Sequence, residues 1–139
     1  MRIYIIIVSV VLFVSCSAQE EQKGRPVDLV GTTWKCKIAD GCINVYEFET
    51  DSTFKFFSCE MEDEYFGSYY FKDGFLMLDQ KGSVYDESFP ESSIHRAERK
   101  LYKVDIKGEE LKHLSMCDWV NDKWVQSDFK FDENYVYRK

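Results

Sequence analysis

The sequence predicts an all-β domain, either a sandwich or a barrel, behind an N-terminal signal peptide. Apolar and polar residues alternate, as in residues 101–107, where Tyr102, Val104 and Ile106 share one face. Two-residue turn signals such as Asp73-Gly74 separate segments of about 8–12 residues. No helical pattern of ten or more residues follows the signal. Short strands joined by tight turns are typical of sandwiches and barrels.

The N-terminus indicates export from the cytoplasm. Residues 3–14 follow Arg2 and are apolar except for Ser9. A membrane-spanning helix needs about 20 apolar residues, so this stretch is too short to span and fits a secretory signal peptide.

The end of that stretch indicates lipid attachment. Phe13-Val14-Ser15-Cys16 resembles a bacterial lipobox, which implies that residues 1–15 are a lipoprotein signal peptide and that Cys16 is lipidated. Ordinary cleavage after Ala18 is the alternative. Several acyl chains would anchor the protein stably to a membrane of the bacterial cell envelope, on its periplasmic or outer side. Residues 16–29 are then a flexible tether, because residues 19–25 contain no apolar side chain.

Composition and the absence of catalytic motifs exclude several classes of function. The net charge of −7 argues against a nucleic-acid partner, because phosphate contacts need basic patches. The chain has no Gly-x-Ser-x-Gly elbow, no glycine-rich phosphate loop and no His-Glu-x-x-His, and His95 and His113 lack motif-spaced partners. The acidic residues 60–64 lack the spacing and glycine of a calcium loop, so a solvated loop is expected. We therefore expect no enzyme activity, no cofactor and no metal.

The strands follow from alternation and turn signals. Asp40-Gly41 and residues 50–52 separate the first three, and Asp73-Gly74 forms the next hairpin. Leu111 and Leu114 are out of phase, which a β-bulge would explain. The expected strands are residues 32–38, 43–49, 53–59, 67–72, 75–80, 101–107, 111–116, 119–120 with 124–125, 127–132 and 134–137.

Cys36, Cys42, Cys59 and Cys117 remain after Cys16. An even count in an exported chain predicts two disulfides, with free buried thiols as the alternative. If Thr50 lies opposite Thr53, then Asn44 lies opposite Cys59, and Cys42 is its diagonal neighbour. We therefore predict Cys42–Cys59 with Cys36–Cys117, and a local Cys36–Cys42 bridge is the alternative.

Three motifs together carry a family resemblance. Gly31-Thr32-Thr33-Trp34 resembles the Gly-x-Trp opening of lipocalin-like proteins, with one extra residue. Residues 48–54 resemble the Phe-x-x-Asp-Gly-Thr-Phe hairpin of small bacterial lipocalin-like lipoproteins, with Ser52 in place of glycine, and residues 67–78 match the next hairpin. The resemblance implies an antiparallel up-and-down β-barrel of about eight strands over residues 30–139.

A barrel of this size is either filled by side chains or open to one small ligand. Under the first hypothesis the protein binds a small hydrophobic or amphipathic ligand. Under the second, a filled barrel acts as a protein-interaction or envelope-structural module, and Phe57, Phe75, Trp119 and Trp124 dock a partner. A cavity of about 300 Å³ or more favours the first. The predicted ligand-binding side chains face inward: Tyr46, Phe48, Phe54, Phe56, Tyr69, Phe71 and Tyr102, beside Leu76, Leu78, Val104 and Ile106.

Overall fold

The computed structural model describes residues 27–88 and 98–138. Four predicted features lie wholly or mostly outside these residues: the signal peptide, the lipidation site at Cys16, the tether and the loop residue His95. In the part of the chain that is described, no helix has the length and apolar character needed to cross a membrane.

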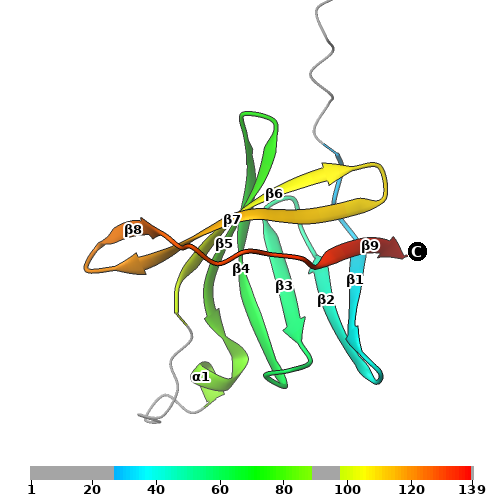
Figure 1. Ribbon diagram of the computed structural model, residues 1–139, viewed down its shortest axis with the longest axis horizontal. Coiled ribbons are helices and arrows are strands. Elements are labelled where there is room, and N and C mark those ends of the chain that lie inside the picture. Colours follow the sequence, from blue (N-terminus) through cyan, green and yellow to red (C-terminus); the bar gives the residue numbers. More distant parts are fainter. Residues whose placement is uncertain (1–26, 89–97, 139) are drawn as a thin grey trace, which may run out of the picture.

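The described residues form an antiparallel β-barrel (Figure 1). Each strand from β1 to β7 pairs with the next, and β9 pairs with both β7 and β1, which closes a ring of eight strands. This confirms the predicted barrel. β8 lies outside the ring as the second arm of a hairpin with β7. The elements are β1 (Thr32–Ala39), β2 (Cys42–Phe48), β3 (Thr53–Ser58), β4 (Asp63–Lys72), β5 (Phe75–Ser83), α1 (Val84–Ser88), β6 (Lys100–Lys107), β7 (Glu110–Val120), β8 (Lys123–Gln126) and β9 (Asn134–Arg138).

Local chemistry accounts for the hairpins. Asp73 and Gly74 have φ of 53° and 81°, and Asn121 and Asp122 have φ of 48° and 59°. Positive φ at both central positions is the type I′ geometry, which matches the twist of the flanking strands. These residue types tolerate that backbone, so the turns after β4 and β7 were predictable.

A β-bulge in β7 confirms the prediction made from Leu111 and Leu114. Lys103 pairs with Ser115, whereas its neighbour Val104 pairs with His113, so Leu114 has no partner on β6. Leu114 is 49% exposed, while Leu111 and His113 are buried in the barrel. The bulge therefore places a histidine inside the molecule.

The strand predicted over residues 127–132 is wrong. Residues 127–133 contain no strand and instead cross from β8 to β9, in front of the barrel strands in Figure 1. Their alternating pattern is typical of a strand, but the facing edge of β7 already pairs with β8 and β9. We call residues 127–133 the crossing segment.

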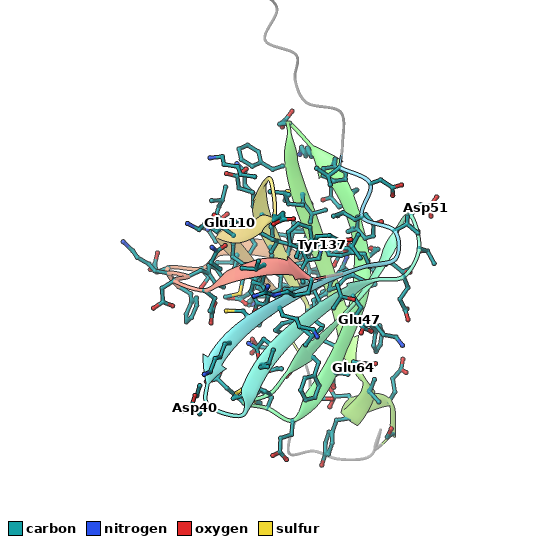
Figure 2. The ribbon with its side chains drawn as sticks, turned by 90° about the vertical axis from the view of Figure 1, so that its right-hand side faces the viewer. Asp40, Glu47, Asp51, Glu64, Glu110 and Tyr137 are labelled. Atoms are coloured by element: carbon teal, nitrogen blue, oxygen red, sulfur yellow. A yellow bond between two sulfur atoms is a disulfide. The ribbon has the colours of Figure 1, made fainter. Side chains whose placement is uncertain are left out.

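The barrel has a closed and an open end. The closed end carries the β2–β3 and β4–β5 turns and lies at the top of Figure 1; the open end carries the β1–β2 and β3–β4 turns and α1. Figure 2 shows Asp51 and Asp40 at these two ends and Glu47 and Glu64 on the outer face. Apolar side chains form one core cluster inside the barrel. It includes Leu29, Trp34, Phe48, Phe54, Leu76, Leu78, Val104 and Leu111.

Two residues near the closed end differ from their predicted places. Leu29, assigned to the tether, is only 1% exposed, and its carbonyl accepts a 2.6 Å hydrogen bond from the Thr32 hydroxyl. Phe71 was predicted to face the interior but is 36% exposed. It lies near the tip of the β4–β5 hairpin (Figure 1), beyond Ser68, the last residue of β4 that pairs with β3, so β3 does not cover this part of β4.

The disulfide between Cys42 and Cys59 is confirmed, with Cα atoms 5.3 Å apart. The strand register used to predict it is wrong by one residue, because Phe48 pairs with Phe54. The Thr50 hydroxyl accepts a hydrogen bond from the Thr53 amide at 3.0 Å and closes a three-residue loop.

The predicted Cys36–Cys117 disulfide is wrong, as is the alternative Cys36–Cys42 bridge. Cys36 and Cys117 are both free thiols. Cys36 is buried in the barrel interior, whereas the Cys117 thiol donates to the Gln126 side-chain oxygen beside β8. β9 also separates β1 from β7 in the ring, so the two thiols cannot meet.

Candidate functional site

A pocket of about 320 Å³ lies in the open half of the barrel. Its walls come from β2, β3, β6, β7, β9 and the crossing segment. Aromatic rings form most of the wall and polar side chains form the rim. The rings are Tyr46, Phe56, Tyr102, His113, Phe129, Phe131 and Tyr135, and the other lining residues are Asn44, Ser58, Glu60, Lys100, Met116 and Glu133.

The rings of the wall contact one another closely. The Tyr46 ring lies 4.4 Å from Phe56 and 5.0 Å from Tyr135, measured between ring centroids. On the other side, the His113 ring lies 5.1 Å from Tyr102 and 4.9 Å from Phe131. Because each ring is supported by its neighbours, the wall is preorganised rather than assembled around a ligand.

A tyrosine and a histidine are hydrogen-bonded inside the barrel. The Tyr46 hydroxyl lies 2.9 Å from His113 Nε2, and both residues are buried. Burial lowers the pKa of His113 to about 4, because the interior disfavours the imidazolium. Burial likewise raises the pKa of Tyr46 and Tyr102. These side chains are therefore polar but uncharged near pH 7.

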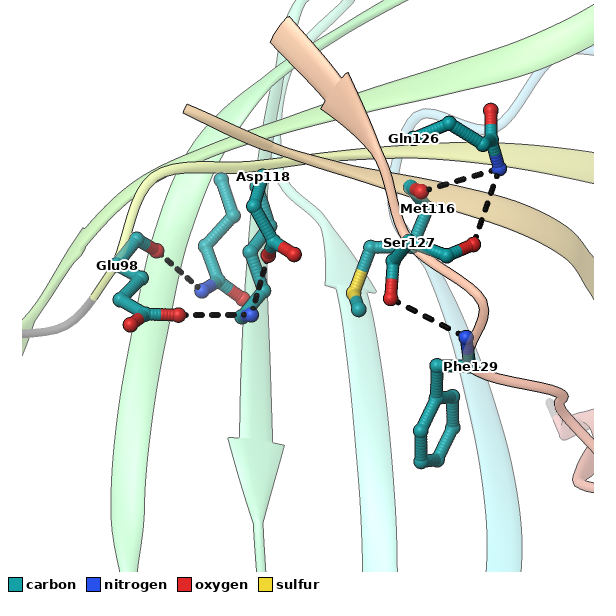
Figure 3. A network of polar contacts seen from close by, with 8 residues as sticks. Glu98, Met116, Asp118, Gln126, Ser127 and Phe129 are labelled. Carbon is teal, nitrogen blue, oxygen red and sulfur yellow. Dashed lines mark hydrogen bonds and ion pairs between the residues drawn. The ribbon is translucent and has the colours of Figure 1, made fainter. Parts of the chain in front are cut away.

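The lysine at the rim already has acidic partners. Lys100 Nζ lies 2.7 Å from an Asp118 oxygen and 3.1 Å from a Glu98 oxygen (Figure 3). Burial lowers the pKa of Lys100, but these hydrogen bonds outweigh it, and the net shift is upward. The charge of this lysine is therefore compensated.

Two glutamates at the rim differ from Lys100. Glu60 and Glu133 make no ion pair with any other residue that the structure describes. Burial raises the pKa of the Glu133 carboxyl, and the nearby charges of Asp132 and Glu60 raise it further. The same two glutamates line a groove of about 490 Å³ outside the pocket, together with Asp132, Asn134 and Lys37, and this lysine is ion-paired with Asp40. The rim is therefore acidic.

The crossing segment is fixed to the barrel where it begins. The Ser127 amide donates to the Met116 carbonyl at 2.9 Å, and Gln126 Nε2 donates to the same carbonyl at 3.3 Å. The Ser127 hydroxyl accepts the Phe129 amide at 3.2 Å (Figure 3). These bonds direct Phe129 and Phe131 toward the pocket, where both side chains line the wall.

The structure divides the predicted ligand-binding residues into three groups. Tyr46, Phe56 and Tyr102 line the pocket. Phe48, Phe54 and Tyr69 belong to the same core cluster as Tyr46 but do not line the pocket, and Phe71 lies outside the interior.

Sequence reasoning did not assign the other ten lining residues to the ligand site. They are Asn44, Ser58, Glu60, Lys100, His113, Met116, Phe129, Phe131, Glu133 and Tyr135. The alternating phase of residues 134–137 was a signal for Tyr135. Nothing in the sequence indicated that residues 127–133 cross the pocket, since that depends on which strand edges are occupied.

Two of the outer aromatic residues predicted to dock a partner, Trp119 and Trp124, pack around the Arg99 side chain. The Arg99 guanidinium lies 5.0 Å from both the Trp119 and Trp124 ring centroids. The same guanidinium makes two hydrogen bonds to Asp79, of 3.1 and 2.9 Å. This cluster joins the two tryptophans of the β7–β8 hairpin to Arg99 and Asp79, so part of the predicted docking surface is engaged within the chain.

Among the described residues, no cluster of three or more His, Cys, Asp and Glu side chains is arranged to hold a metal ion. Comparisons of the chain with protein-family models, with curated proteins and with solved structures found no match.

Proposed function

We propose that this protein is a lipocalin-like lipoprotein of the bacterial cell envelope that binds one small hydrophobic or amphipathic ligand and catalyses no reaction. The observation that carries the proposal is the aromatic pocket of about 320 Å³ in a barrel that is otherwise filled. That volume is at the lower end of the range of small-molecule sites. A largely apolar, preformed wall with a few polar groups is typical of such sites.

The proposed ligand is small because only half of the barrel is open. Phe48 and Tyr69 fill the closed end, with ring centroids 5.1 Å apart. The Tyr69 hydroxyl also donates to the Thr50 carbonyl at 2.6 Å, which fixes this ring in place. A ligand with a long chain would have to displace this packed layer, so a compact molecule is favoured.

The location in the envelope is inferred from the lipobox-like sequence that ends in Cys16. We expect Cys16→Ser to abolish incorporation of labelled palmitate, with Cys36→Ser as the matched control. Labelling that persists in Cys16→Ser would reject lipid attachment at this residue.

The alternative is a non-enzymatic module that docks an envelope protein. The observation that favours it is the β7–β8 hairpin, which projects from the barrel and exposes Trp119, Val120 and Val125 (Figure 1). The two functions predict different effects of filling the pocket, because a docking surface on the hairpin does not depend on the interior.

Two adjacent phenylalanines on β3 provide the test. Phe56 lines the pocket, whereas Phe57 is exposed on the outer face. We would purify the full chain in detergent and measure binding of the neutral probe 2-naphthol by saturation-transfer NMR. Phe56→Trp should reduce the protein-dependent signal at least fivefold, because the larger ring occupies the pocket. Phe57→Trp makes the same chemical change outside the barrel and should leave the signal unchanged.

Native mass spectrometry of the chain from its own cells would then identify a bound molecule by its mass. A saturable probe signal and an adduct, both lost in Phe56→Trp alone, support the proposal. Equal signals in the two variants would mean that the probe does not enter the barrel, and the docking function would be favoured.

A further inference from the structure

We propose that the pocket selects an organic cation, such as a quaternary or protonated amine, whose charge lies between the aromatic wall and the rim glutamates. This inference rests on the proposed function and names the class of ligand. Three observations carry it: the aromatic wall, the uncompensated carboxylates, and buried polar atoms that lack a hydrogen-bond partner.

The aromatic wall suits a cation as well as an apolar group. Tyr46, Tyr102 and Tyr135 come from three different strands and surround the same space with Phe56 and Phe131. The faces of aromatic rings carry negative potential and attract ammonium groups within about 6 Å of the ring centroid. Several rings around one cavity are the arrangement by which proteins bind alkylated ammonium ions.

The rim carries carboxylates that its own lysines do not balance. Lys100 at the pocket is paired with Asp118 and Glu98, and Lys37 at the groove is paired with Asp40. Glu60 and Glu133 line both the pocket and the acidic groove, and neither makes an ion pair within the described ranges. Glu133 is half-buried and its carboxyl has a raised pKa because of burial and neighbouring acids. A cationic ligand at this place would compensate a charge that the chain leaves unbalanced.

Two buried polar atoms at the site also lack a hydrogen-bond partner. His113 is 8% exposed, and its Nδ1 has no hydrogen-bond partner among the described residues. Nδ1 is an acceptor when Nε2–H donates to the Tyr46 hydroxyl, and a donor when the hydroxyl donates to Nε2. Asn134 Oδ1, at the groove, is likewise a buried acceptor without a described partner. A ligand with N–H or O–H groups would supply what these atoms lack.

An anionic ligand fits less well, although Lys100 lies on the rim. Asp118 and Glu98 already neutralise this lysine at 2.7 and 3.1 Å. An anion would have to displace one of these carboxylates and would also approach Glu60 and Glu133. The balance of charge around the opening therefore favours a cation.

Three water-soluble molecules of nearly the same shape provide the test. Choline carries a positive charge, 3,3-dimethylbutan-1-ol is its neutral carbon isostere, and isethionate is an anion of similar size. Their dissociation constants would be measured on the full chain in detergent by ligand-observed NMR. We expect choline to bind at least tenfold more tightly than the neutral isostere and isethionate not to bind.

The variants separate charge from shape. Glu133→Gln keeps the size of the side chain and should reduce the preference for choline about tenfold, and Glu60→Gln should reduce it severalfold. Glu62→Gln is the matched control, since Glu62 lies in the same turn as Glu60 but lines neither cavity. The affinity for the neutral isostere should be the same in all three variants.

The outcomes distinguish this inference from the proposed function. If choline and its isostere bind equally and Glu133→Gln changes neither affinity, the inference that the ligand is a cation is overturned. The pocket would then be a site for neutral ligands. Preferential binding of isethionate would also overturn the inference and would implicate Lys100. If none of the three ligands binds and 2-naphthol also fails, the proposed function itself is rejected.

Discussion

The buried pair of Tyr46 and His113 gives the sharpest prediction. Tyr46→Phe removes a hydroxyl that lies 2.9 Å from His113 Nε2. Nδ1 of the same ring already lacks a partner among the described residues, so the variant leaves a buried imidazole with both nitrogens unpaired. A buried polar group that loses its partner costs about 1–3 kcal/mol, and we therefore expect a loss of about 2 kcal/mol in the free energy of unfolding.

A double-mutant cycle separates this bond from the packing of the rings. His113→Phe alone leaves the Tyr46 hydroxyl buried without its partner, which should also cost about 2 kcal/mol. The double variant Tyr46→Phe with His113→Phe removes both polar groups and leaves two apolar rings in contact. The double variant should therefore be more stable than the sum of the single losses implies, by about 1–2 kcal/mol.

Urea denaturation of the oxidised protein, followed by circular dichroism, measures these losses as shifts of the midpoint at constant m-value. Tyr137→Phe is the matched control, because the Tyr137 hydroxyl makes no side-chain hydrogen bond that the structure describes. It should change stability by less than about 0.5 kcal/mol. Additive losses in the cycle, or an unchanged midpoint in Tyr46→Phe, would refute the assignment of this hydrogen bond.

Three further predictions concern the fold. The pKa of His113 is about 4 in the folded protein and has its ordinary value of 6.5 in the unfolded chain, so between these values unfolding takes up a proton that the folded protein excludes. The free energy of unfolding should therefore fall by about 3 kcal/mol as the pH drops from 6.5 to 4. In His113→Phe this part of the pH dependence, measured by urea denaturation at each pH, should be absent. Replacing Cys42 and Cys59, 17 residues apart, by alanine should cost about 3 kcal/mol in urea titrations without reductant. Gly67→Ala would place its Cβ 2.0 Å from the Asp79 carbonyl oxygen and should cost about 3 kcal/mol or more, measured by thermal unfolding.

Much of the barrel was predictable because local rules decide it. Asp73-Gly74 and Asn121-Asp122 adopt the positive φ that their residue types allow, and each joins two strands as expected. The phase break between Leu111 and Leu114 predicted the bulge. These features depend on neighbouring residues, so one sequence is enough to find them.

The errors arose where a long-range pairing decides the outcome. Residues 127–133 have the alternation of a strand but meet no free strand edge. Cys36 and Cys117 make an even count, yet β9 separates their strands. Phe71 continues the inward phase of β4 beyond Ser68, where the pairing of β4 with β3 ends. Periodicity indicates the face of a side chain but not what stands across from it.

The same limit applies to the pocket. Tyr46 and Phe48 share one face of β2, and no local pattern distinguishes them. Phe48 nevertheless packs at the closed end, while Tyr46 forms part of the pocket wall. The difference comes from position along the barrel axis, which depends on the register of all the strands together.

The disulfide has a structural role at the end of the barrel that the core does not fill. Ladder pairing between β2 and β3 ends at Val45 and Phe57, on the side toward the open end. Beyond that pair, Asn44 Oδ1 accepts the Cys59 amide at 2.9 Å and the Cys42–Cys59 bond joins the strands. Both connections hold the strands together without placing apolar side chains in the interior. A pocket costs packing energy, and a covalent link beside it offsets that loss while leaving the space open. Reduction of this disulfide should therefore loosen the pocket before it unfolds the filled end.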